Sequence, residues 1–430
     1  MNNSKRRIVV TGIGAICPLG RNVDEIHEKI LQGESSVRDI TTDYPWTKNF
    51  DVKIGSVYGP NYFKYSRRTS RFTYLAQNVT EQAIKDSGLA ELLSCPEEST
   101  DDVKRRTEEI RRRTGILLGV GLGGLIEIEK QMQILVSPRN NERFNKMFML
   151  SVIPDAAPGS IANLYHLHAD SAAIGTACAS ASSAMMYGAM HIREDNADIM
   201  ICGGTVEAIT ELTYRGFVGI KALSTKRNHE PKKASRPFDK DRDGFVLGEG
   251  SGVLVLEELE HAQNRNAKIY AELVGYGCSS DGTHFTEPNM DYQIMAMEMA
   301  LKKSGLSPEQ IDFVNCHGTS TLHDSTESYA IRKVFGLHAD RLVCNSYKGH
   351  IGHTTTASGG IESALLIKAM QQSIIPPTLN LENPDIEGGC DLDYNAFIPG
   401  ELRRKFINYA MKNSFGFYGH NIVLIFRKWI

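Results

Sequence analysis

Residues 172–190 read AAIGTACASASSAMMYGAM, and this stretch decides how the chain folds. An apolar run ends at Ile174, Gly175 permits a tight turn, and the residues after Cys178 are small and uncharged as far as Met190. Ala and Met favour helix, and small side chains let a helix pack closely against neighbouring backbone. The pattern predicts a strand ending near Ile174, a turn, and a deeply buried helix with Cys178 in its first turn.

A thiol at the start of a helix can be reactive, because free N–H groups and the helix dipole stabilise a thiolate there. A lone buried cysteine is more often a small apolar core residue, so Cys178 alone does not define a site. The eight cysteines are scattered without a CxxC pair, which argues against a disulfide framework or a zinc knuckle. No metal site is predicted.

Composition restricts the possible functions. The chain has 430 residues, 41% hydrophobic and 23% charged, with a net charge of −3, which gives no reason to expect nucleic acid or a membrane surface as partner. No apolar run reaches the roughly 18 residues that a spanning helix needs. The start, MNNSKRRIVVTGIG, lacks the apolar core of a signal peptide, and we expect a cytoplasmic protein.

Strand and helix patterns alternate in both halves, which predicts α/β sheets covered by helices on both faces.

Two motifs resemble binding sites for a dinucleotide and for calcium, but neither is complete. Residues 119–124, GVGLGG, match a dinucleotide fingerprint but lie mid-chain without the acidic residue that should end the next strand. Residues 239–244, DKDRDG, resemble a calcium loop, but its twelfth position is Gly250 instead of glutamate. We expect neither a nucleotide nor calcium.

Three reactive side chains follow predicted strand ends: Cys178, His317 and His353. Functional groups gather at the carboxyl ends of strands in open α/β sheets. The thiolate of Cys178 is a nucleophile, and two histidines can hydrogen-bond a carbonyl oxygen on which negative charge develops. The combination predicts a catalytic site, although each histidine alone is more often structural.

The sequence around these residues resembles the β-ketoacyl-acyl-carrier-protein synthases. The segments that carry the resemblance are GTACASAS, SRPFDKDRDGFVLGEG, NCHGTST, KGHIGHTTTASGGIE, PPTLNLENPD and NSFGFYGHN. They occur in order along essentially the whole chain, most closely as in synthase II-type enzymes and polyketide ketosynthases. The resemblance implies a thiolase-type α/β fold, with two similar βαβαβαββ halves in a five-layered αβαβα arrangement. It places the nucleophile in residues 1–260 and both histidines in residues 261–430.

The resemblance also implies the reaction. Cys178 takes an acyl group from a carrier protein, malonyl-carrier protein loses CO2, and the resulting carbanion attacks the thioester, giving a 3-oxoacyl chain two carbons longer. Fatty-acid and polyketide pathways both use this condensation. No cofactor is implied, since the phosphopantetheine belongs to the carrier protein. The chain is expected to be a homodimer or to pair with a chain-length-factor subunit.

The resemblance assigns roles to further residues. Lys348, with Glu327 as its acidic partner, is expected to hold the histidines, and the N–H groups of Cys178 and Phe417 to form the oxyanion hole. Phe417 is also the expected gate. The remaining assignments are Thr319 and Thr321 to the pantetheine arm, Leu122 to the floor of the acyl pocket, and Arg67, Arg68, Arg71 and Lys221 to carrier-protein docking.

The sequence departs from the family at two places. The loop after HGTST is one residue short and carries His323, and the gating loop has Tyr418 and His420 where the family has small residues. Three alternatives stay open at this stage. They are a non-catalytic chain-length factor, which usually lacks the cysteine; a thiolase or initiating synthase acting on coenzyme A; and a cysteine hydrolase, which needs an orienting Asn or Asp.

Overall fold

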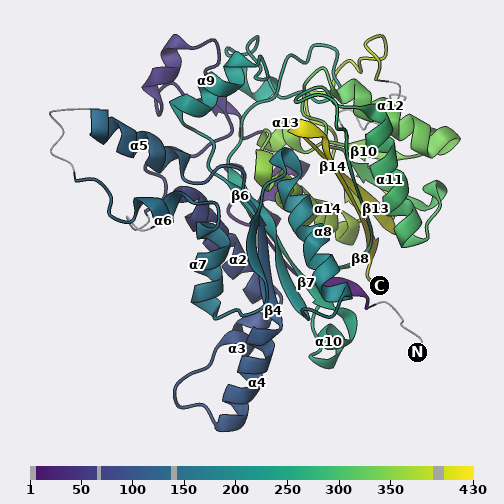
Figure 1. The fold of residues 1–430 in the computed structure, drawn as a ribbon. Coiled ribbons are helices and arrows are strands. Elements are labelled where there is room, and N and C mark those ends of the chain that lie inside the picture. The colour runs from purple at the N-terminus through teal and green to yellow at the C-terminus, as the bar shows by residue number, and fades with distance from the viewer. Residues whose placement is uncertain (1–5, 65–68, 137–142, 391–400) are drawn as a thin grey trace.

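The computed structural model describes residues 6–64, 69–136, 143–390 and 401–430 (Figure 1). Ten strands form one sheet in the order β10-β9-β13-β14-β8-β1-β7-β6-β4-β5. The strands of the first half and those of the second meet where β1 pairs with β8, antiparallel. The sheet is therefore built from two five-stranded parts, one from each half of the chain.

The two halves repeat one sequence of elements, βαβαβαββ. The first half contains β1 (Ile8–Ile16), α2 (Arg71–Asp86), β4 (Thr114–Gly119), α7 (Ala156–Tyr165), β5 (Ser171–Ile174), α8 (Ser180–Arg193), β6 (Ile199–Val206) and β7 (Gly250–Glu258). The second contains β8 (Ala271–Ser280), α11 (Met290–Ser304), β9 (Phe313–Asn315), α12 (Asp324–Phe335), β10 (Val343–Asn345), α14 (Ser358–Gln372), β13 (Tyr409–Gly416) and β14 (His420–Lys428). In both, the sheet order of the strands is third, second, fourth, fifth, first. The predicted thiolase-type fold is confirmed.

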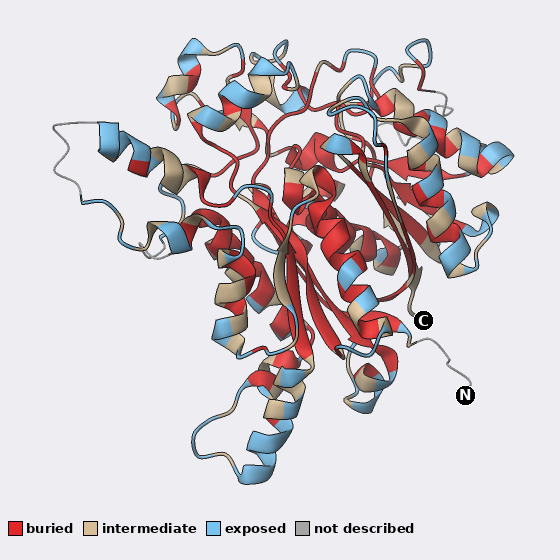
Figure 2. Ribbon diagram, viewed as in Figure 1, coloured by how far each residue is buried: buried red, intermediate tan, exposed pale blue. Residues whose placement is uncertain are grey.

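Further helices and strands lie outside the two repeats. They are α1 (Val23–Leu31), β2 (Arg38–Asp39), β3 (Ile54–Gly55), α3 (Leu89–Leu93), α4 (Asp101–Arg112), α5 (Leu125–Val136), α6 (Phe148–Val152), α9 (Glu211–Gly219), α10 (Leu259–Asn264), α13 (Lys348–Ile351), β11 (Ile374–Ile375) and β12 (Arg403–Arg404). The charged helix α4 projects into solvent, as its composition predicts (Figure 2). Among the described residues, no helix has the length and apolarity to cross a membrane.

The helices form layers around the two halves of the sheet (Figure 1). Helices α2 and α7 pack on the outer face of the first half, and α11 and α12 on the outer face of the second. Helices α8 and α14 contact strands of both halves and lie between them. This gives the five layers, and it explains why β1 is buried along its whole length: both faces of its sheet are covered.

The two central helices cross at close range. A Cβ atom on Gly359 of α14 would lie 2.3 Å from Oγ of Ser182 on α8, so a larger residue would push the helices apart. The small residues of the 172–190 stretch therefore serve the packing that was predicted for them. Gly119, in the motif that imitates a dinucleotide fingerprint, also allows a close approach, because a Cβ there would lie 2.5 Å from the backbone nitrogen of Ala181. The predicted division at residues 260/261 falls within α10, between the repeats, and stays a prediction.

Candidate active site

Cys178 lies between β5 and α8. It occupies the single 3-10 turn η2 (Ala177–Ala179), directly before α8, so the predicted position in the helix is displaced by two residues. Ala177 has a φ of 47°, a conformation that residues with a Cβ seldom adopt and that the surrounding structure must hold in place. The Ser180 hydroxyl does so in part: it accepts the N–H of Thr176 and donates to the carbonyl of Ala177.

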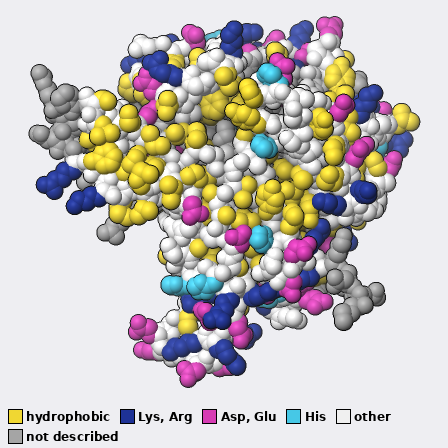
Figure 3. All heavy atoms as spheres, in the orientation of Figure 1, with side chains coloured by type: hydrophobic (Ala, Val, Ile, Leu, Met, Phe, Trp, Pro, Cys, Tyr) yellow, Lys and Arg dark blue, Asp and Glu magenta, His cyan; other side chains and the backbone are white. Residues whose placement is uncertain are grey.

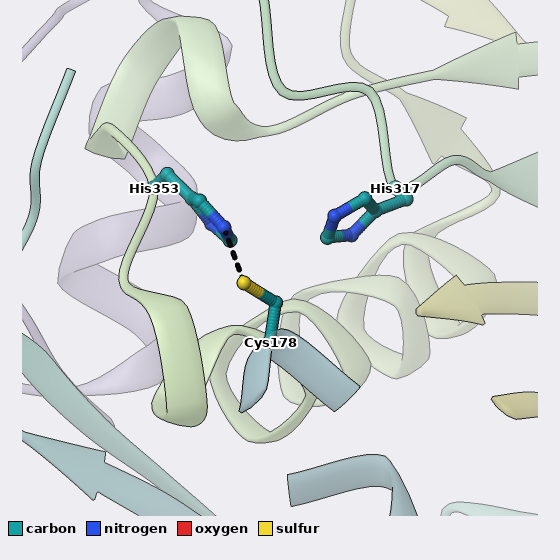
Figure 4. A group of neighbouring side chains, drawn as sticks. All are labelled: Cys178, His317 and His353. Carbon is teal, nitrogen blue, oxygen red and sulfur yellow. Dashed lines mark hydrogen bonds between the residues drawn. The ribbon is translucent and has the colours of Figure 1, made fainter. Parts of the chain in front are cut away.

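His353 approaches Cys178 from the second half of the chain. Its Nε2 lies 3.0 Å from the sulfur, and its Nδ1 lies 3.2 Å from the hydroxyl of Ser358 at the start of α14 (Figure 4). With the ring proton on Nδ1 and donated to Ser358, Nε2 carries a free lone pair that can take the thiol proton. The backbone N–H of His353 donates to the carbonyl of Val246, which fixes the residue against the first half.

His317 follows β9 and faces the same sulfur (Figure 4). The ring centroids of the two histidines lie 5.4 Å apart, and the sulfur and one nitrogen of each ring lie within 4.8 Å of one another. Cys-His-His is also a zinc ligand set, but ligands of one tetrahedral zinc are about 3.5 Å apart. The 3.0 Å between Nε2 and the sulfur is instead a hydrogen-bond length, which suits proton transfer.

Burial sets the charge states of the three groups. It raises the pKa of the Cys178 thiol to about 11, although the nearby Lys348 and the N–H groups of Phe417 and Cys178 oppose the shift. Burial, and then the positive charge of Lys348, lower the pKa of both His317 and His353 well below the usual value. The resting site at neutral pH is therefore a thiol beside two neutral imidazoles, and the histidines can donate hydrogen bonds without carrying charge.

Behind the histidines lies a buried cluster of three charged residues. Glu362 on α14 forms ion pairs with Nζ of Lys348 at 2.6 Å and with Nζ of Lys412 on β13 at 2.7 Å, and all three side chains are fully buried. Lys348 also donates to the backbone carbonyl of His317 at 2.6 Å. The cluster thus ties α13, α14 and β13 together and holds the segment that carries His317. It leaves one net positive charge close to Cys178.

The predicted pairing of Lys348 with Glu327 is wrong, because Glu362 occupies that place. Glu327 accepts the backbone N–H groups of His317 and Gly318, each at 2.8 Å, and the side-chain amide of Asn413 at 3.0 Å. Its carboxylate therefore holds the turn that presents His317, so it acts on the same histidine by another route. Glu362 was missed, although it closes the segment KGHIGHTTTASGGIE; an acid inside a buried helix requires a charged partner.

A cavity of about 250 Å³ opens onto the three reactive side chains. Thr319, Thr321 and Phe417 line it, as does Lys221, whose side chain is exposed. The hydroxyls of Thr319 and Thr321 lie 2.9 Å apart and form one polar patch on the wall. Four residues assigned from the resemblance therefore border a path from the surface to Cys178.

The loop that carries Phe417 has unusual backbone geometry. Tyr418 has a φ of 62°, where glycine would be unstrained, and its exposed ring lies 5.4 Å from that of Phe285, tilted by 53°. Its N–H donates to the carbonyl of Phe285 at 2.7 Å. The substitution noted in the sequence thus adds an aromatic contact to Phe285, which lines the cavity. A changed opening of this loop stays a prediction.

One assignment fails in the structure. Arg71 is only 2% exposed and pairs with the buried Glu249 at 3.2 Å, so it stabilises the start of α2 and is not free to dock a partner. Leu122 is exposed in the single chain and does not line the cavity described above, and its assignment to the acyl pocket stays a prediction. Arg67 and Arg68 lie outside the described residues.

The comparisons with known proteins agree with this geometry. Residues 5–262 match the family described as "Beta-ketoacyl synthase, N-terminal domain", and residues 270–382 match its C-terminal domain. The 3-oxoacyl-[acyl-carrier-protein] synthase 2 of Synechocystis is 40% identical over 100% of this chain and 99% of that protein. The protein of the same name from Coxiella burnetii is 39% identical over 99% of each.

Solved structures show the same likeness. A type II polyketide ketosynthase in complex with its acyl carrier protein superposes with a TM-score of 0.86 at 29% identity, covering 99% of this chain and 100% of that one. The ishigamide ketosynthase/chain length factor superposes equally well at 28% identity, over 99% of this chain and 100% of that one. This chain belongs to the β-ketoacyl synthase family.

Proposed function

We propose that the protein condenses an acyl group held on Cys178 with the malonyl group of a malonyl-acyl-carrier protein. The observation that carries this proposal is the convergence of a nucleophilic thiol and two neutral imidazoles at the end of one cavity. The relatives named above are 3-oxoacyl-[acyl-carrier-protein] synthases, and a thiol nucleophile beside two hydrogen-bond donors suits the reaction they are named for.

The first step is acyl transfer. Nε2 of His353 takes the proton of the Cys178 thiol, and the sulfur attacks the carbonyl carbon of the acyl thioester. The N–H groups of Cys178 and Phe417 hydrogen-bond the oxygen on which negative charge collects. Both N–H groups lower the pKa of the Cys178 thiol against the effect of burial, so they favour negative charge at this place. The carrier's thiolate leaves, and the proton held on His353 returns to it.

The second step is decarboxylation and condensation. For this step His353 takes the other tautomer, in which Nε2 carries the proton and Nδ1 accepts from the hydroxyl of Ser358. The carbonyl oxygen of the malonyl thioester then accepts hydrogen bonds from His317 and from Nε2 of His353, the bond to CO2 breaks, and its electron pair forms the enolate. The enolate carbon attacks the Cys178 thioester, and the cysteine sulfur leaves. Neutral histidines suit this task, since they stabilise the developing charge by hydrogen bonds. We propose that the site uses no resident metal or cofactor.

The alternatives fit the site less well. A chain-length factor would not need Cys178 beside two histidines, and thiolases and initiating synthases resemble Cys-His-Cys and Cys-His-Asn sets. A cysteine hydrolase would need an orienting carboxylate or amide on its base, whereas Nδ1 of His353 contacts the hydroxyl of Ser358.

We infer that an acidic carrier protein docks at the mouth of the cavity, where Lys221 is exposed. A structural neighbour is titled as a complex with its acyl carrier protein. Lys221→Glu should raise KM for the carrier-bound substrate without changing kcat, because it alters encounter and docking only. The predicted cytoplasmic location remains a prediction.

We also infer a second thiolase-fold chain as partner. Strand β5 forms an open edge of the sheet, and apolar side chains gather on the neighbouring surface over α5 and α6 (Figure 3). The exposed members are Leu122, Met132, Leu135, Val136, Met149, Leu150 and Leu164. Leu150→Glu should then lower the mass measured by light scattering, whereas Leu337→Glu, at a 90% exposed position on another surface, should not.

The function is tested with hexanoyl- and malonyl-carrier protein, by measuring CO2 release and the mass of the product. The wild-type protein should yield a 3-oxo-octanoyl carrier, and Cys178→Ala should yield none. Condensation by the variant, or a wild-type protein that only hydrolyses the hexanoyl thioester, would contradict the proposal.

A further inference from the structure

Gln293 is a polar group of the cavity wall that the mechanism does not use. It lies in the first turns of α11, a helix packed against β8 and β14. Its side chain is only 2% exposed, and it lines the same cavity as Cys178, His317 and Phe417. Among the described residues its Oε1 has no hydrogen-bond partner. A buried amide oxygen without a partner costs free energy, so its presence here requires an explanation.

The neighbouring polar groups are already occupied. Nδ2 of Asn421, another residue of the cavity wall, donates to Asp281 at 2.6 Å and to the hydroxyl of Ser279 at 3.2 Å. The carboxylate of Glu327 accepts from the turn of His317. The local protein therefore does not satisfy Oε1 of Gln293. That oxygen exposes less than 1 Å² of surface, so the side-chain amide has to turn toward the cavity before a bound group can donate to it.

A primary amide accepts through its oxygen and donates through its nitrogen, which complements the N–H and C=O of a secondary amide. Under the proposed function, the group that fills this cavity between the surface and Cys178 is a pantetheine arm, which contains two secondary amides. An alkyl acyl chain offers no such group. Thr319 and Thr321, on the loop after β9, provide hydroxyls in the same cavity.

We propose that Gln293 binds an amide of the pantetheine arm and so positions the thioester over Cys178. This inference rests on the proposed function only for the identity of the arm. Gln293 on α11 would then bind the arm together with Thr319 and Thr321. Bound substrate would supply the hydrogen-bond donor that the amide oxygen of Gln293 lacks. Carrier-bound and free pantetheine thioesters share this chemistry.

The test measures binding separately from condensation. Two unreactive thioethers, S-ethylpantetheine and the amide-free butyl ethyl sulfide, are titrated against alkylation of Cys178 by iodoacetamide, and the half-protecting concentration is read by mass spectrometry. The variant is Gln293→Met, which keeps the approximate shape and removes the amide. The matched control is Ile294→Leu, at the adjacent half-buried position, which does not line the cavity.

We expect the half-protecting concentration of S-ethylpantetheine to rise about 3- to 10-fold in Gln293→Met, the usual effect of one hydrogen bond. That of butyl ethyl sulfide, and both values in Ile294→Leu, should stay unchanged. Equal weakening toward both compounds would show a purely structural residue and overturn the inference, as would no change. Absent protection of the wild-type protein by S-ethylpantetheine would also overturn it.

Failure of the proposed function has a different signature. In one outcome S-ethylpantetheine protects Cys178 less well in Gln293→Met than in the wild type, but the wild-type protein releases no CO2 from malonyl-carrier protein. That outcome would support the pantetheine contact and reject condensation. A further measurement compares KM and kcat of the wild type and of Gln293→Met with malonyl-pantetheine as substrate. The contact is expected to act mainly on KM, because it exists in both the bound substrate and the transition state.

Discussion

The turns before α8 and before α14 occupy equivalent places in the two halves of the chain. Each is a single 3-10 turn, η2 before α8 and η6 (Thr355–Ala357) before α14, and each leads into a helix that begins with serine. Each also contains a strained residue, Ala177 with φ of 47° and Thr355 with φ of 38°. The next residue is Cys178 in the first half and Thr356 in the second.

The surroundings of these two residues differ. Cys178 opens onto the cavity and faces two imidazoles, both supplied by the second half. Thr356 is buried, and its hydroxyl donates to the carbonyl of Thr205 at 2.9 Å. The fold therefore builds the same presenting turn twice, and chemistry arises only where the other half provides histidines. The first half supplies the nucleophile, and the second supplies the groups that activate it and stabilise charge.

The largest effect on activity is expected when one of the two histidines that face Cys178 is replaced. His317→Asn and His353→Asn should each lower the rate of condensation about 10²- to 10³-fold, as loss of one charge-stabilising donor does. Only His353→Asn should also slow acyl transfer, because only His353 contacts the sulfur. CO2 release and the acylation rate of Cys178 measure the two steps. Condensation within tenfold of wild type in both variants would contradict the assigned roles.

The second difference between the halves is a buried charged residue, which α14 contains and α8 lacks at the equivalent position. Counting from the serine that begins each helix, Glu362 of α14 corresponds to Ala184 of α8. Glu362→Gln leaves Lys348 and Lys412 without their counter-ion and should destabilise the protein by about 3–5 kcal/mol. Urea unfolding measures this, with the exposed Glu298→Gln as a control within about 0.5 kcal/mol. Equal stability of both variants would show that the cluster is not held as described.

The histidines of the site should make stability depend on pH in one direction. Their folded pKa values lie well below 6.5, so below pH 6.5 the unfolded chain binds protons that the folded protein does not, and stability falls on acidification. Each contributes about 1 kcal/mol of loss between pH 6.5 and 5.5. His353→Asn should therefore lose about 1 kcal/mol less than wild type over this interval in urea unfolding. An identical or larger loss would contradict the neutral state of His353.

The smallest effect is expected in the second turn. Thr356→Val removes one buried hydrogen bond and should cost about 1 kcal/mol of stability, measured by urea unfolding, with the condensation rate unchanged. A hundredfold loss of activity in this variant would mean that the turn before α14 takes part in the chemistry, and the comparison between the halves would be wrong.

Local sequence predicts one part of this picture well. The small residues around Cys178 predict a buried helix, since small side chains let a helix pack closely against neighbouring backbone. The segments around His317 and His353 place both residues at strand ends. These features depend on the order of residues along the chain. The strand alternation likewise predicts the fold class, and the motif order predicts the family.

The sequence predicts the partners of charged residues poorly. Arg71 belongs to a basic cluster, but the fold buries it against Glu249, 178 residues away. Lys348 pairs with Glu362 and not with the predicted Glu327, because the fold brings Glu362 of α14 to its ammonium group. Gln293 carries no local signal of its position in the cavity wall. These contacts depend on tertiary packing, which residue spacing alone does not define.

The most direct test of the central claim is to locate the acyl group by mass spectrometry after exposure to acyl-carrier protein. Three chains are compared: wild type, Cys178→Ala, and Cys178→Ala with Thr356→Cys, which moves the thiol to the equivalent turn. The account predicts an adduct on the Cys178 peptide of the wild type and none in either variant. An adduct on a different residue of the wild type, or at position 356 of the double variant, would contradict it.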